Sequence, residues 1–188
     1  MRATYPFHIE SEFQVYCKPR VNPTLSNFCK ELTAITQEQI DTSGVYLRNA
    51  LEAYAAWLTG TGLPSIQDDS FTVVTWGDSD LIVLQNQCKS EGITRPGLFD
   101  RWVNLKALFK QHYRKEPRGG LQHVVEKVCG LPFEGRAHSG LVDSFNTAKI
   151  CQQMLRQGFV FNRTTRGFGA DGNAFGSRKP SREPVAEV

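Results

Sequence analysis

The chain has 188 residues, of which 40% are hydrophobic and 22% charged, with a formal net charge of +3. A chain of this length normally forms one domain with its own core, and this composition excludes wholesale disorder, a collagen-like repeat and a coiled coil. The charge is too small to indicate a polybasic nucleic-acid binder, so any nucleic-acid function has to come from a specific site.

The five cysteines indicate reduced thiols rather than a disulfide framework. Their number is odd, and they form neither a CxxC pair nor a cluster with histidine at zinc-ligand spacing. We expect most of them to pack as small apolar groups. The N-terminal residues lack the apolar core of a signal peptide, and no apolar run approaches the roughly 18 residues of a membrane helix. The sequence therefore predicts a soluble, intracellular protein of the cytoplasm or nucleus, with no membrane partner.

The first part of the chain is predicted to contain one strand and one long helix. Apolar and polar residues mostly alternate over 9–17, which is typical of a half-buried strand. Residues 36–39 (TQEQ) have the form of a capping box, which marks a helix start. The apolar residues of 45–58 recur at helical spacing and predict a helix that ends at Gly60 and Gly62.

From residue 71 onward, predicted strands alternate with predicted helices. A β-branched and aromatic run at 71–75 precedes one helical pattern, and 102–105 precedes another at 106–113. Two further helices, each followed by a glycine, are predicted at 121–129 and 141–157. This alternation predicts an α/β fold in which helices flank a sheet.

The composition changes after residue 162. The stretch 163–188 is rich in glycine and proline, has no apolar period, and carries five basic against three acidic residues. We therefore expect one domain at 1–162 and a flexible tail at 163–188. The tail is either a solvated terminus or a weak contact for a polyanion.

Two groups of polar residues could carry chemistry. Asp78 and Asp80 follow the strand predicted at 71–75, where α/β folds place their sites, although aspartates there also commonly cap a helix. His138 lies on a glycine-flanked loop, and Asp143 begins the last predicted helix. An imidazole and a carboxylate at this spacing could take a proton from water and hold a hard cation such as Mg²⁺. A surface histidine beside a helix-start aspartate is the alternative.

The segment 138–144 (HSGLVDS), followed by Asn146, resembles the third motif of DEDDh 3′–5′ exonucleases. It is most similar to the enhanced-RNA-interference exoribonucleases, in particular the branch of the prion-protein-interacting exoribonuclease. Further segments match this family in order and spacing: 10–13 (ESEF), 25–29 (LSNFC), 31–36 (ELTAIT), 71–81 (FTVVTWGDSDL), 102–106 (WVNLK) and 158–161 (GFVF). The resemblance covers roughly residues 7–166.

The resemblance implies a ribonuclease-H-like fold, with a mixed sheet flanked by helices. It also implies hydrolysis of phosphodiester bonds at RNA 3′ ends by a two-metal mechanism with Mg²⁺ or Mn²⁺. By motif position, Asp80 and Asp143 are the expected metal ligands and His138 is the expected general base.

The resemblance also implies a substrate-binding segment. Leu32 and Thr33 resemble the residues that touch the terminal nucleotide, and Trp76 would offer a surface on which a base stacks. For Leu32 and Trp76, packing in the core is the alternative. The expected partner is RNA, with DNA as a second candidate.

The sequence departs from the family pattern in four places. Ser79 stands where an aromatic residue usually precedes the second-motif aspartate, Val142 replaces an often acidic residue, and Ala34 replaces a glycine. The first motif, Asp-x-Glu, occurs nowhere in the 188 residues, and the Glu10-Ser11-Glu12 segment aligns with a later strand. We therefore expect the family's first two strands to be missing, which would leave two strands with unpaired edges.

Two functional hypotheses follow. The first is a 3′–5′ exoribonuclease domain, with little activity in this exact chain because the first motif is absent. The second is a catalytically deficient nucleic-acid-binding or interaction module derived from such an exonuclease. A metal phosphatase or nuclease of another fold would explain Asp80 and His138 but not the ordered segments.

Overall fold

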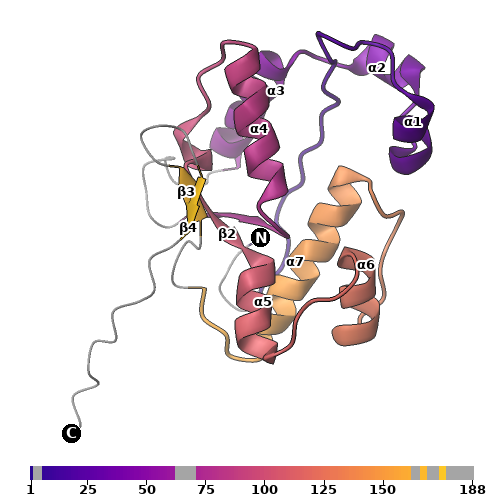
Figure 1. Cartoon of the computed structure of the whole chain (residues 1–188). Coiled ribbons are helices and arrows are strands. Elements are labelled where there is room, and N and C mark those ends of the chain that lie inside the picture. The colour runs from indigo at the N-terminus through magenta and orange to yellow at the C-terminus, as the bar shows by residue number, and fades with distance from the viewer. Residues whose placement is uncertain (2–5, 62–70, 162–165, 169–173, 177–188) are drawn as a thin grey trace, which may run out of the picture.

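The computed structural model describes residues 1, 6–61, 71–161, 166–168 and 174–176 (Figure 1). The first half contains α1 (Asn27–Thr33), α2 (Gln37–Ser43), α3 (Leu47–Gly60), β1 (Val73–Thr75) and α4 (Ser79–Ser90). The second half contains the 3₁₀ turn η1 (Gly97–Phe99), β2 (Arg101–Asn104), α5 (Leu105–Tyr113), α6 (Leu121–His123), the π-helical turn η2 (Val124–Val128), α7 (Gly140–Arg156), β3 (Arg166–Phe168) and β4 (Ala174–Gly176).

The described strands form a small mixed sheet in the order β1-β2-β3-β4. β1 and β2 are parallel, with Val73 opposite Trp102 and Thr75 opposite Asn104, whereas β3 and β4 are antiparallel to their neighbours. Because β1 leads into α4 and β2 leads into α5, both helices begin at the same edge of the sheet. The predicted α/β class and mixed sheet are therefore confirmed.

The strand predicted at 9–17 is wrong. Only Cys17 forms an isolated bridge, with Val45, whose backbone N–H donates to the Tyr16 carbonyl oxygen at 2.9 Å. The alternation holds only in part: Phe13 and Val15 are half-buried and Gln14 is exposed, but Tyr16 is also half-buried and Cys17 is exposed. A strand also needs a partner for its backbone groups, and among the described residues no strand pairs with this extended segment.

Helices α2 and α3 follow the sequence pattern, whereas α1 was not predicted. The capping box predicted at 36–39 is present: the Thr36 hydroxyl accepts from the Gln39 N–H at 3.1 Å, and the Gln39 side chain accepts from the Thr36 N–H at 2.8 Å. The predicted helix at 45–58 is α3, which ends at Gly60 and buries Leu47 and Leu58. Local patterning and capping therefore determine these two helices.

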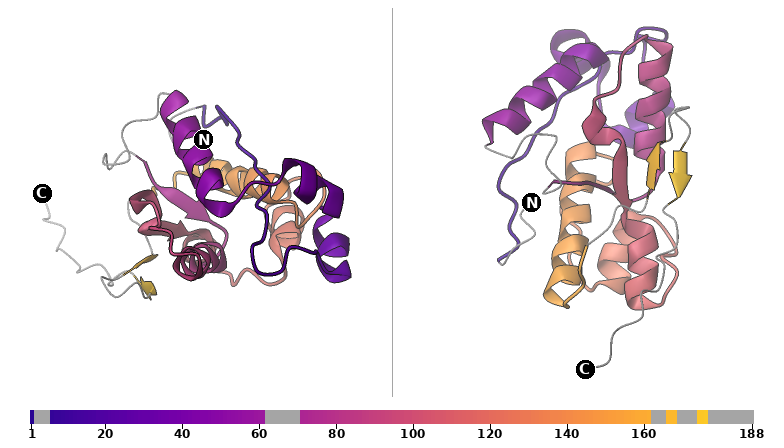
Figure 2. Two further views of the ribbon diagram at one scale, coloured as in Figure 1. Left: turned by 90° about the horizontal axis from the view of Figure 1, so that it is seen from above. Right: turned by 90° about the vertical axis from the view of Figure 1, so that its left-hand side faces the viewer.

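The main core lies between α5, η2 and α7. Helices α5 and α7 lie side by side (Figures 1 and 2). Its fully buried side chains are Leu105, Phe109, Val124, Val125, Ile150 and Met154. The helix predicted at 121–129 is interrupted by the π-helical turn, in which the Cys129 N–H donates to the Val124 carbonyl oxygen at 2.9 Å. Val124 and Val125 are both buried at this turn. The spacing of apolar residues in a regular helix would not predict burial of two adjacent positions in this way.

The tail predicted at 163–188 lies mostly outside the described residues. Within it, however, β3 and β4 extend the sheet from β2. Both strands have three residues, contain a glycine and lack the β-branched residues that revealed β1, so the sequence does not predict them.

Two further expectations concern the cysteines and membrane spans. All five cysteines are free, and Cys88, Cys129 and Cys151 are buried as predicted, whereas Cys17 and Cys29 are exposed. In the described part of the chain, no helix has both the length and the apolar character needed to cross a membrane.

Helix α1 ends on a residue that is poorly suited to its backbone conformation. Ala34 adopts φ 59° and ψ 16°, the left-handed conformation, and its N–H donates to the Lys30 carbonyl oxygen. An L-residue other than glycine in this conformation costs about 1–2 kcal/mol. The glycine expected here in the resembling family would avoid this cost.

We therefore predict that Ala34→Gly raises the free energy of unfolding by about 0.5–1 kcal/mol, since relief of the strain exceeds the extra chain entropy of glycine. Urea unfolding followed by circular dichroism measures this change. The matched control is Ala53→Gly on the exposed face of α3, which should lower stability by about 0.5–1 kcal/mol. Equal losses in both variants would show that residue 34 is not left-handed in solution.

Candidate active site

The turn between β1 and α4 places Asp80 in the first turn of α4. The Lys106 backbone N–H donates to the Trp76 carbonyl oxygen at 3.2 Å, which ties the turn to the start of α5. The Trp102 indole N–H donates to Asp78 Oδ1 at 3.1 Å, which ties it to β2. Asp78 therefore positions the turn and makes no capping hydrogen bond, while Asp80 remains at the surface.

The loop before α7 places His138 beside Asp143. Asp143 lies in the first turn of α7, where its N–H donates to the Ser139 carbonyl oxygen at 2.8 Å. Its Oδ2 accepts from the His138 backbone N–H at 3.1 Å. His138 has φ 66°, a left-handed conformation that histidine adopts more readily than most residues. The carboxylate thus holds the loop through its backbone, and the imidazole remains exposed.

A fully buried amide fixes the start of this loop. Asn146 Nδ2 donates to the carbonyl oxygens of Glu134 and Val142, both at 2.9 Å, and its Oδ1 accepts from the Glu134 N–H at 3.2 Å. Gly135 has φ 83°, and a Cβ atom there would lie 2.8 Å from Val142 Cγ2. The glycine therefore permits both the turn and its close contact with α7. The sequence showed Asn146 only as part of a motif, not as the residue that clamps the loop.

Asp143 lies near enough to Asp80 to affect the ionisation of the Asp80 carboxyl. Partial burial raises the pKa of the Asp80 carboxyl, the Asp143 charge raises it further, and Lys106 lowers it. Partial burial also raises the pKa of Asp143, while the backbone N–H and the ring of His138 lower it. The Asp143 charge thus disfavours ionisation of Asp80, and a bound cation would offset this unfavourable interaction.

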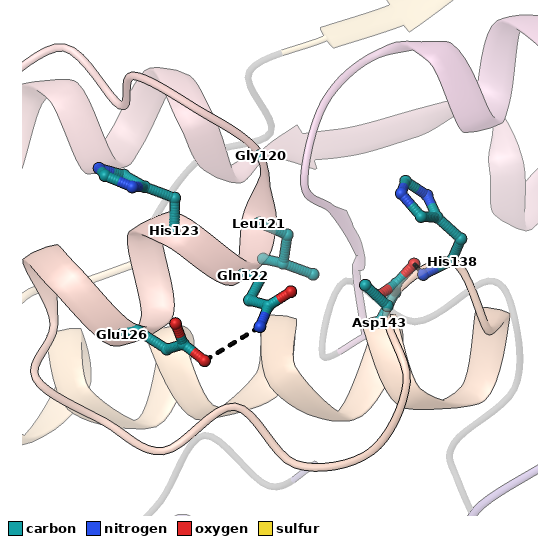
Figure 3. Close-up of a pocket in the computed structure, with 8 residues that line it drawn as sticks. Gly120, Leu121, Gln122, His123, Glu126, His138 and Asp143 are labelled. Carbon is teal, nitrogen blue, oxygen red and sulfur yellow. Dashed lines mark hydrogen bonds between the residues drawn. The ribbon is translucent and has the colours of Figure 1, made fainter. Parts of the chain in front are cut away.

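Beside His138 and Asp143 lies a cleft of about 390 Å³ (Figure 3). This volume falls within the range of roughly 300–1,000 Å³ typical of ligand pockets. The cleft is lined by Gly120, Leu121, Gln122, His123, Glu126, Ala137, His138 and Asp143. The wall formed by α6 and η2 was not predicted from the sequence, because these side chains match no motif.

Of the predicted substrate-binding residues in α1, Thr33 is hydrogen-bonded within its own helix, whereas Leu32 is partly exposed. Thr33 Oγ1 donates to the Cys29 carbonyl oxygen at 2.7 Å and accepts from the Ile35 N–H at 3.2 Å, so it stabilises the end of α1. Leu32 is 36% exposed and available for contact. Residues 134–139, which carry His138, form the loop before α7, called the histidine loop below. Arg136 of this loop donates to the carbonyl oxygen of Glu31, so the end of α1 lies against the loop.

Trp76 lies at the border of the core. Its ring is 6.0 Å from that of Phe109 between centroids, and Lys106 Nζ lies 5.6 Å from the Trp76 ring centroid. Its indole N–H is buried without a hydrogen-bond partner among the described residues. Packing thus accounts for part of the Trp76 ring, and the buried indole N–H is not exposed to a ligand.

The carboxylates fit one divalent ion better than two. Within the described ranges, no group of three or more His, Cys, Asp or Glu side chains is arranged to hold a metal. Mg²⁺, however, is commonly bound by one or two carboxylates together with water and substrate phosphate. Asp80 and Asp143 supply such a pair, whereas the two-ion site expected from the resemblance would need further ligands.

The sequence matches the RNase T exonuclease family over residues 2–151. The chain belongs to the DEDDh exonucleases of this family. It is 39% identical to ERI1 exoribonuclease 2 of Homo sapiens over 170 residues, which cover 83% of this chain and 24% of that protein. It is 35% identical to the 3′-5′ exonuclease Snipper of Drosophila melanogaster over 170 residues, covering 83% of this chain and 58% of the relative. The chain thus spans about a quarter of the length of ERI1 exoribonuclease 2.

Solved structures show the same fold. The nuclease domain of 3′hExo, a DEDDh family member bound to rAMP, superposes with a TM-score of 0.73 at 31% identity, covering 80% of this chain and 74% of that chain. The structure described as 3′-end specific recognition of histone mRNA stem-loop by 3′-exonuclease gives a TM-score of 0.84 at 28% identity, covering 97% and 61%. The family resemblance and the expected fold are therefore confirmed. Members of this family typically use divalent metals.

Because its pKa is raised in the folded protein, Asp80 lowers stability at neutral pH. Protonated Asp80 stabilises the folded state relative to the unfolded state. This contribution is fully present below the ordinary carboxyl pKa of 3.8 and is lost as the pH rises through the raised pKa of the folded protein. We predict that Asp80→Asn is more stable than the unchanged protein at pH 7, and that this gain disappears near about pH 3.

Unfolding free energies measured between these two pH values, without divalent ions, check this prediction. The control is Glu52→Gln, a solvent-exposed carboxyl on α3. A loss of stability in Asp80→Asn at neutral pH would mean that the charge of Asp80 is favourably paired.

Proposed function

We propose that this chain is a 3′–5′ exoribonuclease domain that hydrolyses phosphodiester bonds at RNA 3′ ends. Asp80 and Asp143 would hold a divalent ion, and His138 would act as the general base. One observation carries this proposal: the histidine loop is anchored on Asp143, and the carboxylate of Asp143 also lies within electrostatic reach of Asp80.

The chain's own residues supply the remaining steps. The exposed His138 ring can accept a proton from the attacking water, because Asp143 binds the backbone and not the imidazole. Asn146 keeps the loop in place during this transfer. When bound, Mg²⁺ or Mn²⁺ would polarise the phosphodiester and activate the water. Lys106, next to Asp80, adds positive charge that attracts the phosphate backbone.

RNA is the proposed substrate and DNA the second candidate. The similar proteins named above are exoribonucleases or a 3′-5′ exonuclease, and one similar structure concerns a histone mRNA stem-loop. Leu32 offers exposed apolar surface for the terminal nucleotide, and the Trp76 ring is the proposed surface on which a base stacks. Thr33 would act mainly by shaping the end of α1.

A second candidate function is binding of RNA 3′ ends without hydrolysis. It is favoured by the absence of Asp-x-Glu from the sequence and by the limited number of carboxylates at the described site. Loss of metal ligands would reduce hydrolysis more than RNA binding, because most residues that line the cleft are not metal ligands.

The first proposal predicts that the chain shortens a 5′-labelled single-stranded RNA from its 3′ end in Mg²⁺ or Mn²⁺. His138→Ala should lower turnover by about 10² to 10⁴, the usual contribution of a general base, while RNA binding is retained. Denaturing gels measure shortening, and fluorescence anisotropy measures binding. The control is His112→Ala, since His112 bonds Gln157 near the other end of α7.

Each remaining result has a definite meaning. RNA binding with no shortening by the unchanged chain would favour the non-hydrolytic module. Shortening that is equal in His138→Ala and the unchanged chain would show that another group takes the proton.

A further inference from the structure

The cleft has a second wall that the proposed mechanism does not use. His138 and Asp143 lie on one side, and Gln122, His123 and Glu126 of α6 and η2 lie on the other (Figure 3). A nucleotide whose phosphate is near Asp143 would place another part of itself against this second wall. The polar groups of the wall indicate which part.

Gln122 and Glu126 form a fixed acceptor surface. Gln122 Nε2 donates to Glu126 Oε1 at 3.1 Å (Figure 3). This bond holds the carboxylate and leaves Glu126 Oε2 and the Gln122 carbonyl oxygen as acceptors. A phosphate would be repelled by the Glu126 charge, whereas sugar hydroxyls donate hydrogen bonds to carboxylates. An acidic side chain binds ribose hydroxyls in dinucleotide sites for this same reason.

His123 is held against the wall by the preceding loop. A Cβ atom on Gly119 would lie 2.9 Å from Cβ and Cγ of His123, and Gly119 has φ 79°. Glycine therefore lets the backbone pack directly on the side chain. In the described part of the chain, neither ring nitrogen of His123 makes a hydrogen bond. A neutral imidazole offers one donor and one acceptor, which suits a hydroxyl.

We propose that Gln122, His123 and Glu126 bind the ribose of the nucleotide through its hydroxyls, so that the cleft selects ribonucleotides over deoxyribonucleotides. The 2′-hydroxyl is the group by which a protein distinguishes RNA from DNA at one site. This inference rests on the proposed function, because it takes the cleft to be the place where the RNA end binds.

The test is a titration of the whole chain with AMP and with dAMP in Mg²⁺ buffer, followed by the NMR signals of its four histidine rings. AMP should shift His123 and His138 and leave His8 and His112 as unperturbed references. AMP should bind about three- to tenfold more tightly than dAMP, which corresponds to one hydrogen bond.

Two variants locate the selectivity. Glu126→Gln and His123→Ala should each bring the AMP affinity towards that of dAMP and change the dAMP affinity little. Glu52→Gln on the exposed face of α3 is the matched control and should keep the full preference. Thermal unfolding of each variant checks that it is folded.

Two results would overturn the inference. If AMP shifts His138 but not His123, and the AMP preference survives in both variants, the second wall does not read the sugar, while the proposed function stands. If neither histidine shifts with either nucleotide, the cleft is not the nucleotide site, and the proposed function fails with the inference.

Discussion

The proposed metal site depends on holding two like charges, Asp80 and Asp143, on separate helices but within electrostatic reach. The folded structure disfavours the ionised form of Asp80, since partial burial and the Asp143 charge raise the pKa of its carboxyl. Contacts elsewhere must therefore fix both helix starts. The Trp102 indole fixes Asp78 and hence the beginning of α4. The buried amide of Asn146 ties the first turns of α7 to Glu134, and Ile150 and Met154 pack the rest of the helix against the core. A site held against repulsion in this way favours a bound cation.

A second feature of the histidine loop is that its backbone is held in place by hydrogen bonds that do not involve the His138 imidazole. Its backbone is held by Asp143 at one end and by the buried amide of Asn146 at the other. Gly135 allows the close packing on Val142 that this requires. The imidazole of His138 takes no part in these bonds, so the loop is fixed while the ring remains available. Pre-positioning of this kind is what proton transfer needs.

Many elements could be predicted because each has a local signature, and the three candidate site residues were singled out by motif position alone. Capping residues and apolar spacing predict α2 and α3, and an ordered set of motifs predicts His138 together with both aspartates. The failures arise where structure depends on distant partners. Alternation over 9–17 describes burial but cannot supply a neighbouring strand. Likewise, the wall containing His123 and the role of Asn146 follow from tertiary packing, which has no local pattern.

The most direct test of a metal site at Asp80 and Asp143 is titration with Mn²⁺, which broadens NMR signals of nearby groups and has little effect on distant ones. The account predicts that the His138 ring signals broaden at Mn²⁺ concentrations that leave His112 sharp, and that this selectivity disappears in Asp80→Asn and in Asp143→Asn. Selective broadening of His138 that persists in both variants, or no selective broadening in the unchanged chain, would contradict it.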